Sequence, residues 1–371
     1  MTAAPAMSVP TPHADGAGAG AHARYARQLM DDAAAWDEFV AGAPTGAYPQ
    51  LSAWAQVKIP NGWRAQRVLA VAPSGPIGAQ LLMRRLGPGP FSVGYAPRGP
   101  IAREFEAEGV RAFSRAMRRA AARHQLSHVT IDPEVEEGHP LGDLLRANGW
   151  RQGANVQPER TLVVDLDRAE EEIWAGLRSK WRQYVGKARR SGVAVVESDA
   201  SGLGEFYRIY VETAQRAGFL YRTEAAYRDV YEAFAARGAA RLLFARLADG
   251  TAAATLMLLE CGGRVVEPYG GMTAGGADLR ANYLLKWEAI RSSREAGLAV
   301  YDMWGLAHSG IEHFKRGFGG REVRYVGAWE LVRLPPVRTA LLTAHRLRLA
   351  VARRSLGAAR SDDDGGGGAG A

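Results

Sequence analysis

A strand–helix–strand pattern that occurs twice constrains the fold of this chain more than any other feature. The strand-like segment FSVGYAPRGP is followed by a helical segment and a strand ending in HVTIDP, and RVVEPYGGMT leads in the same way to LAVYDMWG. In both copies an aromatic, glycine-rich strand end is followed by a strand that finishes in an aspartate, Asp132 or Asp302. Such repetition is a sign of internal duplication, and open α/β sheets place their sites at strand ends. The sequence therefore predicts two similar α/β units with their loops at one edge of a sheet.

The spacing of apolar residues predicts mixed α/β structure throughout the chain. Helical periodicity extends over 104–124, 169–192 and 280–297, among other segments, and strand-like runs lie between the helices, the last of them at 323–332. No charged heptad run long enough for a coiled-coil arm is present. The predicted fold class is therefore α/β with mixed sheets.

The length of the chain indicates two domains, because 371 residues exceed what one hydrophobic core usually organises. The proline-containing segment NVQPER is typical of a linker. We predict a first unit at 24–158, completed by 327–356, and a second unit at 159–326. The two ends, 1–23 and 357–371, are rich in small and polar residues without periodicity, and we expect them to be disordered.

The charge balance favours an anionic partner. The chain has 47 Lys and Arg against 39 Asp and Glu, a net charge of +8, which suits nucleic acid, phosphate or an acidic membrane surface. The alternative is that arginine replaces lysine throughout an Arg- and Ala-rich chain, without a functional reason for the positive charge.

No targeting segment and no apolar stretch long enough for a bilayer is present, so we expect a cytoplasmic protein. The single cysteine, Cys261, is expected to be a small structural residue.

Lys315 lies between an aromatic residue and a glycine-rich segment, in IEHFKRGFGG. We expect a short helix at 311–316, followed by turns in which Gly317, Gly319 and Gly320 take positive φ. A lysine held between aromatic side chains is suited to stabilise negative charge that appears only in a transition state. The alternative is a lysine that caps the C-terminus of a helix.

A second basic cluster lies in LRSKWRQYVGKARRSGV, where Trp181, Val185 and Ala188 recur with helical spacing and predict a buried stripe. The cations around this stripe are Arg178, Lys180, Arg182, Lys187, Arg189 and Arg190. Such a helix can lie against a phosphate backbone, or it can be an ordinary solvated face. The segment alone does not decide between the two.

Other side chains have the chemistry to contribute to a site. Trp54 and Lys58 are four positions apart on one helical face, and no acidic residue lies three or four positions from Lys58. Arg216 ends a helix, where its guanidinium either enters a cleft or caps carbonyl groups. Asp132 and Asp302 end their strands, and each either accepts a proton, if burial raises its pKa toward neutrality, or fixes a turn.

Acetyltransferase-like folds bind coenzyme A through an Arg/Gln-x-x-Gly-x-Gly/Ala loop that follows a strand and opens a helix, so that free N–H groups face the phosphates. RRSGVA (189–194) and REAGLA (294–299) match this pattern formally, but each closes a predicted helix and enters a strand. We therefore expect no coenzyme A. No nucleotide-binding or metal-ligand motif is present, so neither a cofactor nor a metal is expected.

Four motifs occur in this chain in an order and spacing that resembles the FemABX aminoacyltransferases, which build peptidoglycan cross-bridges. The motifs are KWRQYVGKARRSGV, TAQRAGF, the run from YGGMTAGG to YDMWG, and IEHFKRGFGG. The resemblance covers about 48–332. It implies two acetyltransferase-like (GNAT) domains without a coiled-coil arm, as in the FemX type. It also implies that aminoacyl-tRNA, in place of acetyl-CoA, donates Gly, Ala or Ser to the side-chain amine of a peptidoglycan precursor's stem peptide.

The resemblance implies roles for individual residues. Lys315 matches the family lysine to which charge stabilisation in acyl transfer is attributed, and Phe314 lies beside it. Asp132 lies where a base has been proposed in relatives. The positions that hold the diphosphate and sugar of the precursor are matched by Lys58, Arg216, Tyr221 and Tyr269.

The implied partners are aminoacyl-tRNA and a UDP-linked or lipid-linked precursor, and we expect a monomer. The basic, amphipathic segment 337–356 either contacts the cytoplasmic membrane surface or packs on the first unit. The sequence leaves two other functions open. One is an acyl-CoA-dependent N-acyltransferase of the same fold, and the other is an RNA-binding protein without catalysis.

Overall fold

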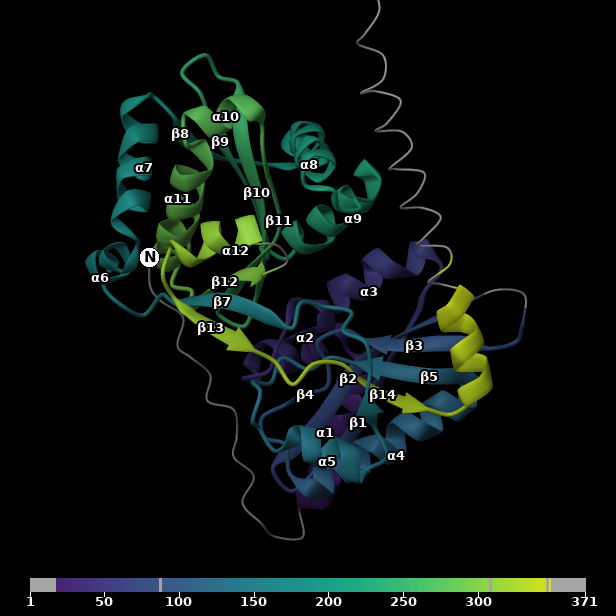
Figure 1. Ribbon diagram of the computed structural model, residues 1–371. Helices are drawn as coiled ribbons and strands as arrows, with labels where there is room; N and C mark the ends of the chain where they lie inside the picture. The colour runs from purple at the N-terminus through teal and green to yellow at the C-terminus, as the bar shows by residue number, and fades with distance from the viewer. Residues whose placement is uncertain (1–17, 87–88, 307–308, 345–346, 348–371) are drawn as a thin grey trace, which may run out of the picture.

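The computed structural model describes residues 18–86, 89–306, 309–344 and 347, and it contains two sheets, which lie one above the other in Figure 1. The predicted C-terminal tail lies outside the described residues, as does most of the N-terminal one. The first helix starts at Gly18, so the last part of the N-terminal tract that we expected to be disordered is helical. None of the helices in the described ranges combines the length and apolar character needed to cross a membrane.

The first unit is built on a sheet with the strand order β1-β2-β3-β5-β14-β6, in which β4 also pairs with β2. Its helices are α1 (Gly18–Asp31), α2 (Ala33–Gly42), α3 (Ser52–Lys58), α4 (Ala107–Arg123) and α5 (Leu141–Ala147), with 3-10 turns at Tyr48–Gln50 and Ile59–Asn61. Its strands are β1 (Arg64–Ala72), β2 (Gly75–Arg85), β3 (Ser92–Ala96), β4 (Ile101–Ala102), β5 (Leu126–Ile131), β6 (Arg151–Gln152) and β14 (Trp329–Val332).

The second unit is built on a sheet with the order β13-β7-β12-β11-β10-β9-β8. Its helices are α6 (Glu170–Gly176), α7 (Ser179–Arg190), α8 (Leu203–Ala217), α9 (Glu224–Ala235), α10 (Ala274–Asp278), α11 (Ala281–Glu295) and α12 (Ser309–Arg316), with a 3-10 turn at Ala200–Gly202. Its strands are β7 (Arg160–Asp165), β8 (Ala194–Ser198), β9 (Ala240–Arg246), β10 (Ala252–Cys261), β11 (Arg264–Met272), β12 (Val300–Gly305) and β13 (Arg321–Arg324).

Each sheet contains a parallel pair of neighbouring strands joined by a helical crossover, which confirms the duplicated pattern. In the first sheet β3 and β5 are parallel, with α4 between them in the chain, and in the second β11 and β12 are parallel, with α10 and α11 between them. The register of β11 and β12 ends at Val266 and Asp302. Beyond these residues the two strands are not paired with each other.

The run 323–332, which we expected to be one strand, is two strands in different sheets. β13 pairs with β7, whereas β14 pairs with β5 and β6. The chain turns between them at Gly327, whose φ of +76° is a left-handed conformation that glycine adopts without steric cost. The amide of Ala328 then donates to the side-chain oxygen of Asn155 (2.9 Å). Through this turn, β14 joins the first sheet.

The segment 169–192, expected as one helix, is broken into α6 and α7. The break lies at Leu177 and Arg178, whose ψ angles are both 142°. There the amide of Arg178 donates to the carbonyl of Gly317 (2.9 Å). The start of α7 is therefore tied to the turn that follows α12.

Apolar packing joins the two units. One core cluster contains Trp36 and Trp54 of the first unit together with Phe206, Tyr227 and Phe234 of the second. Buried aromatic side chains contribute large apolar areas, so this shared cluster stabilises one orientation of the units. The helices α3 and α9 pack on each other at this boundary, as Figure 1 shows.

Candidate functional site

Lys315 lies in α12 and is 9% exposed. Its Nζ donates to the carbonyl oxygens of Trp304 (3.3 Å) and Gly305 (2.8 Å) at the end of β12. An ammonium has three N–H donors, so these two bonds leave one donor unoccupied. Burial, and next the charge of Lys286, lowers the pKa of Lys315 to about 8. The ammonium form still predominates at pH 7 and is available to stabilise a negative charge.

The turn after α12 depends on a close contact as well as on left-handed glycines. Gly319 and Gly320 have φ of +77° and +83°, as predicted, but Gly317 does not have positive φ. A Cβ at Gly317 would lie 2.1 Å from the Trp181 ring, so glycine is required there for space. The Trp181 indole donates to the carbonyl of Phe314 (2.9 Å). In this way α7 holds α12 and the lysine that it carries.

Trp304 connects the lysine to the second aspartate of the duplicated pattern. Its φ is 60°, a left-handed conformation that costs about 1–3 kcal/mol for a bulky residue unless the surroundings impose it. The Trp304 amide donates to Oδ1 of Asp302 (2.7 Å), and its carbonyl accepts from Lys315. Asp302 is 1% exposed, accepts from Thr161 and pairs with Arg264. Asp302 therefore fixes the turn that presents a carbonyl to the lysine.

A buried ionic network continues from Asp302 into the first unit. Arg264 of β11 also pairs with Glu134 (2.6 Å), and Glu134 pairs with Arg98 (3.1 Å). Arg98 is 2% exposed, and its guanidinium lies 5.1 Å from the ring of Trp304. Removing one partner of a buried ion pair costs about 3–5 kcal/mol. The network therefore holds the two units in one arrangement around Trp304.

Asp132 has the same local role in the first unit as Asp302 in the second. One of its carboxylate oxygens accepts from the hydroxyl of Tyr95 (2.7 Å), and the other accepts from the amide of Arg98 (2.6 Å). Arg98 has a φ of 57°, so Asp132 also fixes a left-handed turn. Burial raises the pKa of Asp132 to about 6, although Arg98 opposes this shift.

A second buried lysine lies just beyond the point where β11 and β12 part. Lys286 of α11 pairs with Glu267 of β11, and the hydroxyl of Tyr301 donates to the same carboxylate (2.6 Å).

Both formal coenzyme A motifs have the context that the sequence predicts. Residues 189–194 close α7 and lead into β8, and residues 294–299 close α11 and lead into β12.

Lys58 ends α3 and is 8% exposed. Its Nζ lies 4.1 Å from the centre of the Trp54 ring, as the four-residue spacing predicts. Burial, and next the charge of Arg222, lowers the pKa of Lys58 to about 7, and no carboxylate in the described part of the chain is among the causes. A buried cation beside a second cation is unfavourable until an anion joins them. Lys58 and Arg222 therefore form a candidate anion site.

The tyrosines that the resemblance singles out lie near this pair. Tyr269 of β11 is half-buried, and its ring centre lies 5.2 Å from that of Tyr227. Burial raises the pKa of Tyr269 to about 12, although the charge of Arg222 opposes the shift. Tyr221 packs against the core cluster that the two units share.

Arg216 uses its donors within its own unit. Its guanidinium donates to the carbonyl of Met272 (2.6 Å) and pairs with Glu212 (3.3 Å). The carbonyl that Arg216 bonds lies at the end of β11 and does not belong to its own helix. The sequence carries no signal that selects Arg222, because its proximity to Lys58 is created by the packing of the two units.

Aromatic contacts connect the two site lysines across the boundary. The ring of Trp54, which lies against Lys58, is 5.5 Å from that of Tyr48, and Tyr48 is 5.8 Å from the ring of Trp304. The Trp304 carbonyl then accepts from Lys315. Tyr48 and Trp304 escaped the sequence analysis because an aromatic residue carries no signal of which distant segment it will contact.

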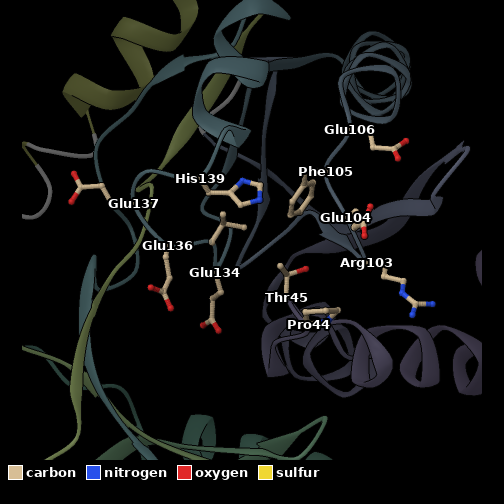
Figure 2. Close-up of a pocket in the computed structure, with 11 residues that line it drawn as sticks. Pro44, Thr45, Arg103, Glu104, Phe105, Glu106, Glu134, Glu136, Glu137 and His139 are labelled. Atoms are coloured by element: carbon tan, nitrogen blue, oxygen red, sulfur yellow. The ribbon is translucent and has the colours of Figure 1, made fainter.

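A hollow of about 520 Å³ lies in the first unit (Figure 2), and neither Lys58 nor Lys315 is among its lining residues. Glutamates dominate its lining, and the rings of Phe105 and His139 meet edge to face within it at 6.0 Å. Glu134, a member of the ionic network, lines it, but none of the predicted site residues does. Its acidic lining does not suit a phosphate. Within the described residues, no group of three or more His, Cys, Asp or Glu side chains is placed to hold a metal ion.

Comparisons with known proteins agree with this architecture. Residues 32–143 match the model of the FemAB family, and residues 175–316 match a model described as an acetyltransferase (GNAT) domain. The lipid II:glycine glycyltransferase of Staphylococcus aureus strain MRSA252 is 30% identical over 223 residues, which are 57% of this chain and 53% of that protein. The protein of the same name from Staphylococcus haemolyticus strain JCSC1435 is 28% identical over the same shares. The chain thus spans about half the length of the curated relatives it matches.

Solved structures show the same fold. The crystal structure of FemX superimposes with a TM-score of 0.75 at 20% identity and covers 82% of this chain and 96% of that one. A tandem GNAT protein from the clavulanic acid biosynthesis pathway has a TM-score of 0.51 at 13% identity and covers 81% of this chain and 96% of that one. At these identities the structural matches establish the tandem GNAT-like fold alone. Taken with the family model and the staphylococcal relatives, they agree with the resemblance of this chain to the FemABX family.

Proposed function

We propose that the protein is an aminoacyltransferase that moves an amino acid from aminoacyl-tRNA to the side-chain amine of a peptidoglycan precursor's stem peptide. The observation that carries the proposal is Lys315, a buried ammonium with one unoccupied donor. Near the same boundary lies the cation of Lys58, which pairs with no carboxylate in the described residues. The matched staphylococcal proteins are named lipid II:glycine glycyltransferases, which is a reaction of this class.

In the proposed reaction, the neutral amine attacks the carbonyl carbon of the aminoacyl ester. The new C–N bond places negative charge on the carbonyl oxygen, which the third N–H of Lys315 stabilises. When the ester C–O bond breaks, the leaving ribose oxygen takes the proton that the amine loses. Phe314, whose ring centre lies 5.2 Å from that of Phe318, precedes the lysine in α12 and would contact the aminoacyl donor. Holding both substrates in one site removes much of the entropy cost of their encounter.

Asp132 is assigned a positioning role in this proposal. Its two oxygens already accept from Tyr95 and Arg98, and these bonds set the turn that places the Arg98 guanidinium against Trp304. A base for the amine is not required if the amine enters in its neutral form and the leaving oxygen takes the proton.

The precursor's diphosphate would bind Lys58 and Arg222, where an anion removes the repulsion between two like charges. Tyr269 and Tyr221 would lie beside its sugar. Arg216 would affect precursor binding only indirectly, by fixing the end of β11, because its guanidinium donates to the Met272 carbonyl there.

An acyl-CoA-dependent N-acyltransferase is the second candidate, favoured by the match of residues 175–316 to an acetyltransferase domain. Two observations count against it. The space beyond the paired part of β11 and β12 holds the buried pair of Lys286 and Glu267. The formal coenzyme A motifs end helices, so they do not offer free N–H groups to a pyrophosphate.

The deciding experiment combines purified protein, precursor and tRNA charged with radiolabelled Gly, Ala or Ser. Precursors with lysine, ornithine or diaminopimelate, each in UDP-linked and lipid-linked form, identify the acceptor. We expect label transfer that ribonuclease pretreatment abolishes. Transfer from acetyl-CoA that survives ribonuclease would establish the second candidate, and RNA binding without transfer of label would leave a binding protein.

Peripheral contact of the basic segment 337–356 with the cytoplasmic membrane also stays a proposal. The structure describes this segment only to residue 344 and at 347, and there Arg338 pairs with Glu330 of β14 (2.5 Å). Full-length protein should pellet with anionic liposomes more than a chain truncated after Pro336. Equal pelleting would refute the contact, and sedimentation equilibrium of the same samples tests the expected monomer.

A further inference from the structure

The outer face of α7 is a basic surface that the proposed mechanism does not yet use. Three of its six cations make polar contacts within the fold: Arg182 donates to the carbonyl of Ala175 (3.0 Å), Lys187 donates to that of Asp278 (3.0 Å), and Arg189 pairs with Glu288 (2.6 Å). Four of the six are exposed and form no ion pair with a carboxylate in the described part of the chain; they are Arg178, Lys180, Lys187 and Arg190.

Aromatic rings alternate with these cations. Tyr184 of α7 and Tyr283 of α11 are half-buried, and their ring centres lie 4.8 Å apart. The guanidinium of Arg280, just before α11, lies 4.6 Å from the Tyr184 ring, and Nζ of Lys180 lies 5.7 Å from it. We call this surface the α7–α11 face; its members are Arg178, Lys180, Tyr184, Lys187, Arg280 and Tyr283.

Two polar atoms at the start of α11 have no hydrogen-bond partner among the described residues, although they are shielded from solvent. They are Nε of Arg280, a donor, and Oδ1 of Asn282, an acceptor. A buried polar atom without a partner costs about 1–3 kcal/mol, so such atoms call for an explanation. A bound group that offers both an acceptor and a donor, as a nucleotide does, would satisfy both.

The α7–α11 face leads to the reacting centre. The ring of Tyr283 lies 5.0 Å from that of Phe314, and Trp181 of α7 donates to the Phe314 carbonyl. Phe314 precedes Lys315 in the chain. Figure 1 shows α7 and α11 packed side by side, with α12 beside their lower ends.

We propose that the α7–α11 face binds the single-stranded 3′ end of the acyl donor's RNA and delivers its terminal ester to Lys315. Unpaired cations beside half-exposed aromatic rings are the combination that binds single-stranded RNA, because the cations neutralise phosphates and the rings stack on bases. This inference rests on the proposed use of aminoacyl-tRNA.

The test measures RNA binding and transfer separately, with full-length protein. Binding is followed by fluorescence anisotropy with an uncharged RNA hairpin that has a single-stranded 3′ end, and with the same hairpin lacking it. Tyr184→Ala and Arg280→Gln should each weaken binding of the first hairpin by roughly 5- to 100-fold, the range of one lost base stack, and bring it close to that of the second. Lys180→Ala should reduce the dependence of log Kd on log salt by about 0.7.

Two control variants keep the result interpretable. Tyr184→Phe retains the ring and should bind like the wild type, which shows that a loss in Tyr184→Ala comes from the missing ring and not from the missing hydroxyl. Arg111→Ala removes an exposed cation from α4 of the first unit and should change neither binding nor the salt dependence.

The outcomes also separate this inference from the proposed function. Wild-type transfer of label together with unchanged RNA binding in Tyr184→Ala and Arg280→Gln would overturn the docking surface and leave the function standing. RNA binding that these variants weaken, in a protein that transfers no label, would support the surface and overturn the function.

Discussion

The two buried lysines of the site, Lys315 and Lys58, have nearly equal exposure but opposite surroundings. Lys315 donates to two backbone carbonyls, which fix its position and favour its charge. Lys58 lies against a tryptophan ring and beside the like charge of Arg222. Burial and a like charge lower the pKa of both lysines, the like charge being Arg222 for Lys58 and Lys286 for Lys315. The carboxylates of Glu267 and Asp302 oppose the shift at Lys315, whose pKa is about 8 against about 7 for Lys58.

This difference indicates which charge each lysine meets. Two of the three N–H donors of Lys315 already bond backbone carbonyls, and the third is available. Lys315 therefore suits a negative charge that appears during the reaction. The surroundings of Lys58 become favourable only when an anion arrives with a ligand. Variants of Lys315 should therefore change kcat, and variants of Lys58 should change KM.

The largest effect is expected for Lys315→Met. Loss of one donor to an oxyanion typically lowers the rate about 10²- to 10³-fold, so kcat should fall by at least that factor while precursor binding stays unchanged. Steady-state kinetics with saturating precursor and calorimetric binding check this. Arg316→Met, which removes the neighbouring half-buried cation of α12 that pairs with Glu312 and Glu322, is the matched control and should stay close to wild type. Near-wild-type turnover in Lys315→Met would remove the lysine from the mechanism.

Lys58→Met and Arg222→Met should mainly raise KM for the precursor. A hydrogen bond to a charged group contributes about 1.5–3 kcal/mol, so each KM should rise roughly 10- to 150-fold with little change in kcat. The pair of variants also tests the anion site, because their effects should not add if both cations bind one diphosphate. A loss of kcat at unchanged KM would contradict the division of roles between the two lysines.

The pKa of Lys58 predicts a pH dependence for precursor binding. Its ammonium form binds the anion and loses its proton as pH rises through about 7. Affinity for the UDP-linked precursor should therefore be highest below pH 7 and fall above it, by at most about tenfold per pH unit. Lys58→Arg keeps its charge over this range and should give a flat profile. A wild-type profile that is equally flat from pH 6 to 8.5 would refute the shifted pKa.

The smallest effect is expected for Arg216→Met. Because its guanidinium is bonded to the Met272 carbonyl and Glu212, it influences the precursor only through β11, and KM should rise no more than a few-fold. An increase as large as that of Arg222→Met would show that Arg216 turns toward the ligand when it binds.

Much of the fold and the local part of the site could be predicted from the sequence. The duplicated pattern indicated the two parallel strand pairs, and the four-residue spacing placed Lys58 on Trp54, because both depend on neighbours within one or two elements. The strand expected at 323–332 was wrong: Gly327 lets the chain leave one sheet for the other, and the apolar pattern does not mark such a change of sheet.

The sequence by itself determined which residues can carry charge at Lys315 and Lys58 and which secondary structure holds them. Only the tertiary structure decided what surrounds them. Arg222 approaches Lys58, and Trp304 presents its carbonyl to Lys315, because apolar packing and a buried ionic network join the two units. The physical reason is that desolvation and Coulomb interactions depend on distance in space, whereas sequence patterns report only on neighbours along the chain.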